Sequence, residues 1–114
     1  VDVESLCAPE FTFLVARRDG RAIGCGAVLR DSRGWGEIKR MFVDPASRGQ
    51  GIGAHILASL EAVAREGELR LMRLETGIHN IEALAAYRWA GYRECGPFGD
   101  YAPDPLSVFM EKRL

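Results

Sequence analysis

Residues 37–53 hold the feature that most constrains the fold: a strand-like segment, then a glycine-rich turn, then the start of a helix. EIKRMFV at positions 37–43 has the apolar character of a central strand, and Asp44-Pro45 ends it because proline cannot donate to a sheet ladder. RGQGIG at positions 48–53 then leads into an apolar run of helical period. Strand, turn and helix in this order predict a crossover unit, and therefore an α/β domain.

Local signals mark the ends of the neighbouring elements. Asp19-Gly20 lies between two apolar runs and is typical of a tight hairpin turn. Gly67 and Gly91 follow the two helical patterns and suit helix C-termini, while Asn80 suits the N-cap of the second helix. The predicted elements are strands at 11–17, 22–29 and 37–43, a helix at 51–65, a strand at 69–76, a helix at 81–90 and strands at 92–96 and 107–114.

This order, β-β-β-α-β-α-β-β, predicts an α/β fold with a mixed, mainly antiparallel central sheet and flanking helices. The chain has 114 residues, 47% of them hydrophobic and 27% charged, so we expect one globular domain over residues 1–114. A net charge of −1 provides no field that would recruit nucleic acid or an anionic membrane.

The three cysteines, Cys7, Cys25 and Cys95, are widely spaced and form no CxxC or Cys/His cluster. We therefore expect neither a disulfide framework nor a zinc site, and a reducing cytoplasm fits best. No apolar stretch approaches the roughly 20 residues that span a bilayer. The start, VDVESLCAPE, carries acidic residues where a signal peptide would carry basic ones.

A glycine-rich turn that opens a helix suits a phosphate, because backbone N–H groups can approach it closely and the helix dipole adds positive potential. A P-loop needs Gly-Lys-Ser/Thr, but Ala54-His55 follow Gly53 here. Residues 49–54 satisfy the dinucleotide pattern G-x-G-x-x-A, yet DPASR separates them from the strand and the chain has too few parallel units for that fold. A surface turn without a ligand is the plain alternative, and three glycines make it entropically expensive.

Two motifs at the right separation resemble the GNAT superfamily of acyl-CoA-dependent N-acetyltransferases. The first is Arg/Gln-x-x-Gly-x-Gly/Ala between a strand and a helix, and the second is an Asn…Ala…Tyr…Gly-Tyr/Phe signature. With their surrounding elements they cover about half of the chain. The matching residues are Arg48, Gly51 and Gly53 in the first motif, and Asn80, Ala83, Tyr87, Gly91 and Tyr92 in the second.

The resemblance implies acetyl-CoA as co-substrate and no metal. Backbone groups of the strand at 37–43 would bind the pantetheine arm, although a plain core strand predicts the same residues. The glycine turn would bind the diphosphate, for which backbone donors suffice without a metal. The implied cofactor-binding residues are Met41, Phe42, Val43, Arg48, Gly49, Gln50, Gly51, Ile52, Gly53, Ala54, Asn80, Ala83 and Tyr87.

The resemblance also implies catalytic roles. Tyr87 stands where the family usually has its general acid, with a packed helical tyrosine as the alternative. Glu37 is the first candidate for the general base and Glu75 the second, while an exposed strand-end carboxylate is an equal alternative for Glu37. His55 and His79 are weaker candidates for the base.

The loop before the last strand would bind the acceptor. Phe98, Asp100 and Tyr101 cluster there and suit a cationic amine, through cation–π and charge contacts. A hairpin loop shaped only by proline and glycine is the alternative. We expect the acceptor to be a small-molecule or peptide amine.

GNAT domains normally begin with a strand and one or two helices that cover the acceptor site. VDVESL at positions 1–6 would here be the remnant of the last of these helices, so we expect an N-terminally short domain. The expected function is direct acetyl transfer from acetyl-CoA to a primary amine. A non-catalytic acyl-CoA-binding regulatory module is the alternative, and a homodimer is expected from the relatives.

Overall fold

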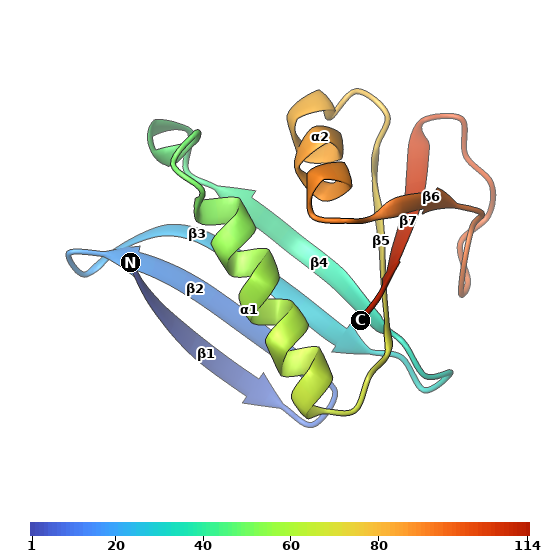
Figure 1. Cartoon of the computed structure of the whole chain (residues 1–114), viewed down its shortest axis with the longest axis horizontal. Helices are drawn as coiled ribbons and strands as arrows, with labels where there is room; N and C mark the ends of the chain where they lie inside the picture. The colour runs from blue at the N-terminus through green and yellow to red at the C-terminus, as the bar shows by residue number, and fades with distance from the viewer.

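The computed structural model describes all 114 residues, which form one seven-stranded sheet with two α-helices and a short 3-10 helix (Figure 1). The observed bounds differ from the predicted ones by at most two residues, apart from one additional strand at the start. In chain order the elements are β1 (Asp2–Ala8), β2 (Phe11–Arg18), β3 (Arg21–Arg30), β4 (Gly36–Val43), η1 (Pro45–Ser47), α1 (Ile52–Glu66), β5 (Leu71–Gly77), α2 (Ile81–Trp89), β6 (Arg93–Cys95) and β7 (Ser107–Arg113).

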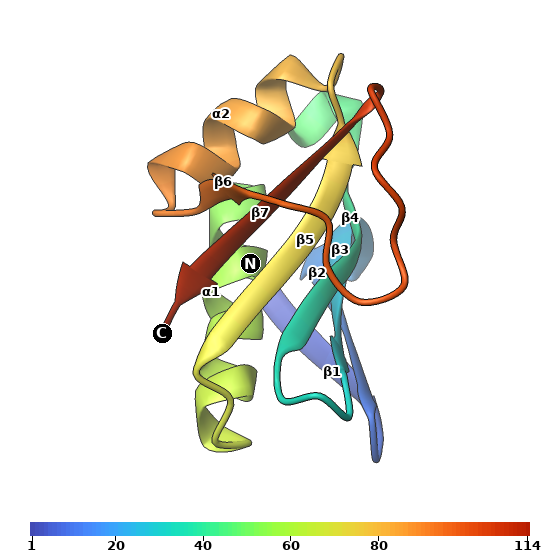
Figure 2. The same cartoon turned by 90° about the vertical axis from the view of Figure 1, so that its right-hand side faces the viewer.

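The sheet has the strand order β1-β2-β3-β4-β5-β7-β6. Every neighbouring pair is antiparallel except β4–β5, which is parallel, so the predicted mixed and mainly antiparallel sheet is confirmed. α1 lies across one face of the sheet, and the loop between β6 and β7 lies on the other (Figure 2). Neither α-helix has the length and apolarity needed to cross a membrane.

The β2–β3 hairpin forms where the Asp-Gly dipeptide predicts it. Arg18 pairs with Arg21, and the two residues between them, Asp19 and Gly20, have φ of 53° and 77°. Two successive left-handed residues match the twist of the flanking strands, which is why a turn of this kind favours a tight hairpin.

Residues 2–8 form the additional strand, so the expectation of a helix remnant at positions 1–6 is wrong. β1 pairs antiparallel with β2 along its whole length, from Asp2 opposite Arg17 to Ala8 opposite Phe11. A helix of about six residues is marginal in water, whereas the open edge of β2 satisfies the backbone groups of both strands. Only Val3 of β1 packs against the core, so the sequence lacks the alternation of apolar and polar residues that would predict this strand.

The main core lies between α1 and the sheet. The buried residues of α1 follow the predicted helical spacing and include Ile56 and Leu60, both with no exposed surface. α1 approaches β3 closely because Gly24 and Gly26 have no side chains: a Cβ on Gly26 would lie 2.8 Å from Ile56 Cγ2. This packing fixes the start of α1 beside the end of β4.

The sheet opens between β4 and β5. The two strands pair only at Gly36–Met72 and Glu37–Arg73, and beyond these pairs they diverge. The register of β4 against β3 shifts where Gly26 faces a bulge, and Arg40 there has a left-handed φ of 58°. The second half of β4 therefore has a neighbouring strand on one side only.

Candidate functional site

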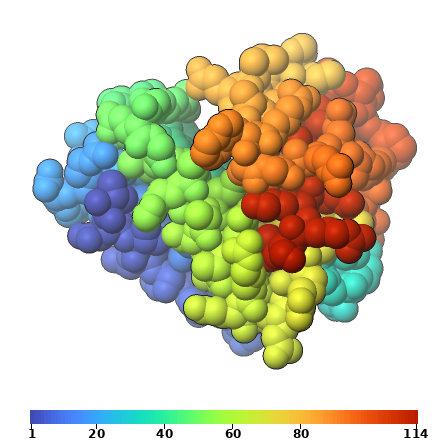
Figure 3. All heavy atoms as spheres, viewed as in Figure 1, coloured from blue at the N-terminus to red at the C-terminus, as the bar shows by residue number.

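A cleft of about 620 Å³ occupies the opening between β4 and β5. Its walls are β4, the glycine turn, the first turns of α1, the end of β5 and one side of α2. The space-filling view shows the surface hollowed between the turn and start of α1 (green) and α2 (orange) (Figure 3). Of the thirteen predicted cofactor-binding residues, only Gln50 does not line this cleft; those that do are Met41, Phe42, Val43, Arg48, Gly49, Gly51, Ile52, Gly53, Ala54, Asn80, Ala83 and Tyr87.

The glycine turn presents unpaired backbone donors at one end of the cleft. Gly49 and Gly51 have φ of 79° and 77°, a conformation that favours glycine. The N–H groups of Gly49, Gln50 and Gly51 donate no hydrogen bond within the protein. Gly51 is the N-cap of α1, which has neither a side-chain cap nor an acidic residue in its first turn. These donors and the helix dipole suit a diphosphate, so the turn fits the part of coenzyme A that the sequence assigns to it.

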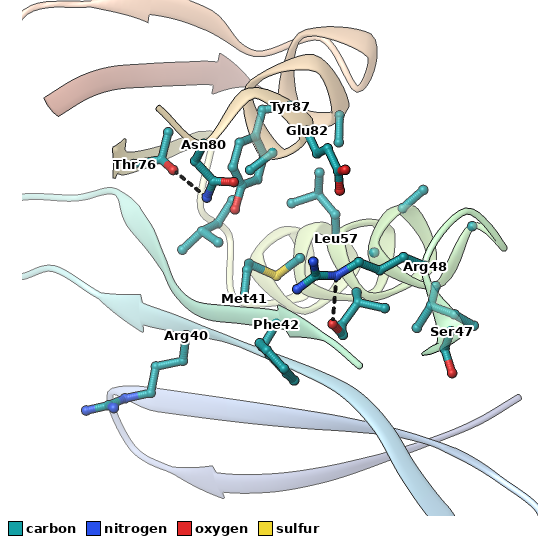
Figure 4. Close-up of a pocket in the computed structure, with 18 of the residues that line it drawn as sticks. Arg40, Met41, Phe42, Ser47, Arg48, Leu57, Thr76, Asn80, Glu82 and Tyr87 are labelled. Atoms are coloured by element: carbon teal, nitrogen blue, oxygen red, sulfur yellow. Dashed lines mark hydrogen bonds between the residues drawn. The ribbon is translucent and has the colours of Figure 1, made fainter. Parts of the chain in front are cut away.

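Arg48 lies between this turn and β4. Its Nε donates to the carbonyl oxygen of Val43 at 3.1 Å, and its guanidinium carbon lies 5.9 Å from the centre of the Phe42 ring. In the close-up its guanidinium reaches into the cleft toward Met41, whereas Arg40 points away (Figure 4). Arg48 thus adds a positive charge to the cleft beside the backbone donors.

Tyr87 forms part of the opposite wall, on α2 (Figure 4). Its side chain is only 8% exposed, and burial raises the pKa of its hydroxyl to about 12. Its ring packs edge-to-face against Tyr92, with ring centres 5.9 Å apart. The hydroxyl therefore keeps its proton at neutral pH, as a general acid must.

Asn80 also lies in this wall, and its side chain does not cap α2 as predicted. Asn80 occupies the N-cap position, but its Nδ2 donates to Thr76 Oγ1 at 3.4 Å, and no capping hydrogen bond forms (Figure 4). The end of β5 supplies this competing partner. The Asn80 amide consequently lies in the cleft, beside Tyr87.

The two candidate bases lie in different places. Glu75 lines the main cleft, and its Oε2 accepts a hydrogen bond from Ser107 Oγ at 2.7 Å. Glu37 is buried but does not line this cleft. Because Ile38 packs in the core beneath α1, strand alternation turns Glu37 and Lys39 toward the opposite face of the sheet.

Glu37 instead lines a second pocket of about 380 Å³, together with all three predicted acceptor residues, Phe98, Asp100 and Tyr101. Tyr101 donates its hydroxyl to Glu37 Oε2 at 2.5 Å, and burial, followed by this carboxylate, raises the pKa of Tyr101. Lys39 Nζ lies 3.5 Å from the same oxygen and lines both cavities. The second pocket is therefore adjacent to the main cleft, across β4.

Aromatic rings and an ion-pair chain form the walls of the second pocket. Phe98 packs edge-to-face against Tyr101, Phe109 and Trp35, with ring centres 5.2, 5.8 and 6.1 Å apart. Arg33 pairs with Asp31 at 2.8 Å and with Asp100 at 3.4 Å. Its hydrogen bonds lower the pKa of Asp31 to about 2, so that carboxylate stays charged.

Sequence reasoning missed Trp35, Arg33 and Lys39 as lining residues, and it missed the buried Glu61. Glu61 lies in the apolar stripe of α1 and accepts hydrogen bonds from Tyr92 Oη and Lys112 Nζ. The sequence signal for its burial was its position one residue after Leu60 and three before Ala64, both of which face the core.

No group of three or more His, Cys, Asp or Glu side chains is arranged to hold a metal ion. His55 and His79 are exposed and line neither cavity.

Comparison with known proteins gives a consistent result. The sequence model of the acetyltransferase (GNAT) family matches residues 2–92. A protein of Azospirillum brasilense named IAA acetyltransferase is 49% identical over 115 aligned residues, covering 100% of this chain and 75% of its own length. A crystal structure from Klebsiella pneumoniae, described as an acyl-CoA N-acyltransferase, superposes with a TM-score of 0.91 at 47% identity over 96% of this chain and 76% of that one.

A more distant structure shares the fold. A protein of Bacillus anthracis described as a streptothricin acetyltransferase, solved in complex with acetyl coenzyme A, superposes with a TM-score of 0.84. It is 22% identical, and the match covers 94% of this chain and 64% of that one.

Proposed function

The chain belongs to the GNAT family and is an acetyltransferase, and from that premise we propose that it moves the acetyl group of acetyl-CoA directly onto a primary amine. The observation that supports this most is the cleft at the opening of β4 and β5, which has an N–H-rich turn at one end and the buried hydroxyl of Tyr87 in its wall. A donor with a diphosphate and a thioester matches both features.

The donor would lie along the second half of β4. On the side that faces β5, the backbone of Met41, Phe42 and Val43 has no neighbouring strand, so it can hydrogen-bond an extended amide-containing arm there; only the Val43 carbonyl already accepts from Arg48. The turn from Gly49 to Ala54 would bind the diphosphate, with Arg48 contributing charge. A metal is not required for this task in the proposal, because the unpaired N–H groups and the Arg48 guanidinium offset much of the diphosphate charge.

The acceptor amine would enter from the second pocket, on the far side of β4. Glu37 and Asp100 supply negative charge there, and the rings of Phe98 and Tyr101 supply the faces that attract cations. A small-molecule or peptide amine that is positively charged before reaction suits these walls. Relatives of this chain carry names of acetyltransferases with different acceptors, an aminoalkylphosphonate in one and a protein N-terminus in another.

The proposed reaction balances with three proton transfers. The ammonium of the acceptor loses a proton to a carboxylate, for which Glu37 is the first candidate and Glu75 the second. The neutral nitrogen attacks the thioester carbonyl carbon, the C–S bond breaks, and the departing thiolate takes the proton of Tyr87. The nitrogen, positively charged after the attack, then gives up its second proton, which returns to the Tyr87 phenolate and leaves a neutral amide and a neutral thiol. Since the pKa of Tyr87 is about 12, its hydroxyl is protonated when the sulfur leaves.

Thermal unfolding with acetyl-CoA tests the donor assignment. We expect acetyl-CoA to raise the melting temperature, because a ligand that binds only the folded state stabilises it. No shift at ligand concentrations well above micromolar would count heavily against the proposal. CoA release with a panel of amines then separates an enzyme from a non-catalytic binding module, which would bind without turnover.

Three variants test the catalytic roles. We expect Tyr87→Phe to retain acetyl-CoA binding and to lower kcat by about 10²–10⁴, the usual range for loss of a general acid. Glu37→Gln and Glu75→Gln identify the general base. If one of these variants no longer shows the fall in rate at acidic pH, the carboxylate that it replaces is the base. Equal kcat for Tyr87→Phe and the parent chain would remove Tyr87 from the acid role.

We also propose a cytoplasmic location, where the three free cysteines would stay reduced. A homodimer remains a prediction, which sedimentation velocity of the purified chain tests directly.

A further inference from the structure

Gln50 differs from its neighbours in the glycine turn because its side chain does not line the cleft. Its Oε1 instead accepts a hydrogen bond from Arg18 Nη1 at 2.6 Å. Arg18 is the last residue of β2, directly before the Asp19-Gly20 turn. The bond therefore connects the tip of the β2–β3 hairpin to the middle of the glycine turn at residues 48–53.

This bond is the only hydrogen bond that Gly49 or Gln50 makes, with either backbone or side chain. The nearest restraints lie outside these two residues. Before them, Arg48 N–H donates to Pro45 O at 3.4 Å and Arg48 Nε donates to Val43 O at 3.1 Å. After them, His55 N–H donates to Gly51 O at 3.0 Å. The side chain of Gln50 is thus the point at which the turn is held from outside.

We propose that Arg18 is a positioning residue for the diphosphate-binding turn and acts through Gln50. Glycine-flanked backbone loses much conformational freedom when a ligand fixes it. The hydrogen bond from Arg18 restricts Gln50 before the ligand binds, so less conformational entropy is lost on binding. Arg18 thereby increases affinity without contacting the ligand. This inference rests on the proposed function, because it takes the diphosphate of acetyl-CoA as the ligand of the turn.

The size of the effect follows from the kind of bond. A guanidinium donor makes the hydrogen bond charge-assisted, but both side chains are exposed, so water offers each of them a replacement partner. We expect loss of the bond to weaken CoA binding by about three- to tenfold, in line with the modest net contribution of one hydrogen bond.

A direct contact between Arg18 and a phosphate of the ligand is the competing explanation. Isothermal titration of the full chain with CoA and with dephospho-CoA, which keeps the diphosphate but lacks the 3′-phosphate, separates the two. The variants are Arg18→Ala, Gln50→Ala and the double variant. Arg17→Ala is the matched control, because it removes the same charge one residue away. Arg17 pairs with Glu4 and donates to Gly20 O of its own hairpin, and it makes no hydrogen bond to the glycine turn.

We expect Arg18→Ala and Gln50→Ala each to weaken both ligands three- to tenfold, and the double variant to be no weaker than either single one. Arg17→Ala should bind as the parent chain does. Additive losses in the double variant, or a loss confined to CoA, would overturn the proposal in favour of a direct phosphate contact. If the parent chain binds neither ligand, the proposed function itself fails, which is distinguishable before any variant is compared.

Discussion

Replacing Glu61 by Gln changes one charge in a buried contact between α1, Tyr92 and β7. Glu61 is 6% exposed; its carboxylate accepts hydrogen bonds from Tyr92 Oη at 2.8 Å and from Lys112 Nζ at 3.0 and 3.2 Å. Glutamine keeps the volume but offers one acceptor oxygen, so one donor loses its partner or meets the amide N–H₂ group.

The structure sets the magnitude of that change. Removing one partner of a fully buried ion pair costs about 3–5 kcal/mol. The Lys112 side chain is 24% exposed, so water can solvate part of its charge and the cost falls to about 2–3 kcal/mol. At roughly 4 °C per kcal/mol for a domain of this size, we expect Glu61→Gln to lower Tm by about 8–12 °C.

Scanning calorimetry and urea unfolding measure this loss in free energy of unfolding. Glu66→Gln is the matched control, because it removes the same charge from the exposed end of α1 and should change stability by less than about 0.5 kcal/mol. Lys112→Met combined with Glu61→Gln should destabilise less than the sum of the two single variants. A loss below about 1 kcal/mol for Glu61→Gln would refute the reasoning.

Two further predictions concern packing and pH. Gly26→Ala places a Cβ 2.5 Å from Met41 Sδ and 2.8 Å from Ile56 Cγ2, so we expect it to lower the free energy of unfolding by about 1–3 kcal/mol. Because Met41 lines the cleft, acetyl-CoA binding should weaken as well. Thermal unfolding and ligand titration measure the two effects, and Gly96→Ala, which has open space around it, should change neither. Tyr87 has a folded-state pKa of about 12 against 10 when unfolded, so its stabilising contribution is complete below pH 10 and is lost as pH rises through 12. Urea unfolding between pH 9 and 12 should show a loss of about 2–3 kcal/mol from this group, and an identical loss in Tyr87→Phe would exclude Tyr87 as its source.

Features encoded by neighbouring residues could be predicted from the sequence. The β2–β3 turn depends only on Asp19-Gly20, and the buried face of α1 depends only on spacing. The turn between β4 and α1 was recognised from its three alternating glycines between a strand and a helix, and two of them, Gly49 and Gly51, have left-handed backbone. The hairpin turn and the face of α1 need no knowledge of the rest of the chain, whereas the ligand of the glycine turn was inferred only together with the second motif at residues 80–92.

Features that depend on distant partners could not be predicted. β1 buries almost no side chain, so its pairing with β2 leaves no pattern to read. Glu61 is charged in an apolar stripe, and only Lys112, 51 positions later, explains it. The pocket of Glu37 was equally hidden, because its walls come from residues 29–39 and 98–101.

The opening of the sheet has a consequence for self-association. From Ile38 to Val43, β4 is an edge strand, and exposed edges invite pairing with strands of other molecules, which leads to aggregation. Most edges of this kind lie on the perimeter of a protein, but this one is in the middle of a sheet, in a cleft walled by α1 and α2. A polypeptide strand carries side chains on both faces and would collide with these helices, whereas a thin, unbranched molecule would not. The same geometry therefore keeps the unpaired backbone of β4 available to a slender ligand and prevents copies of the chain from pairing at this edge.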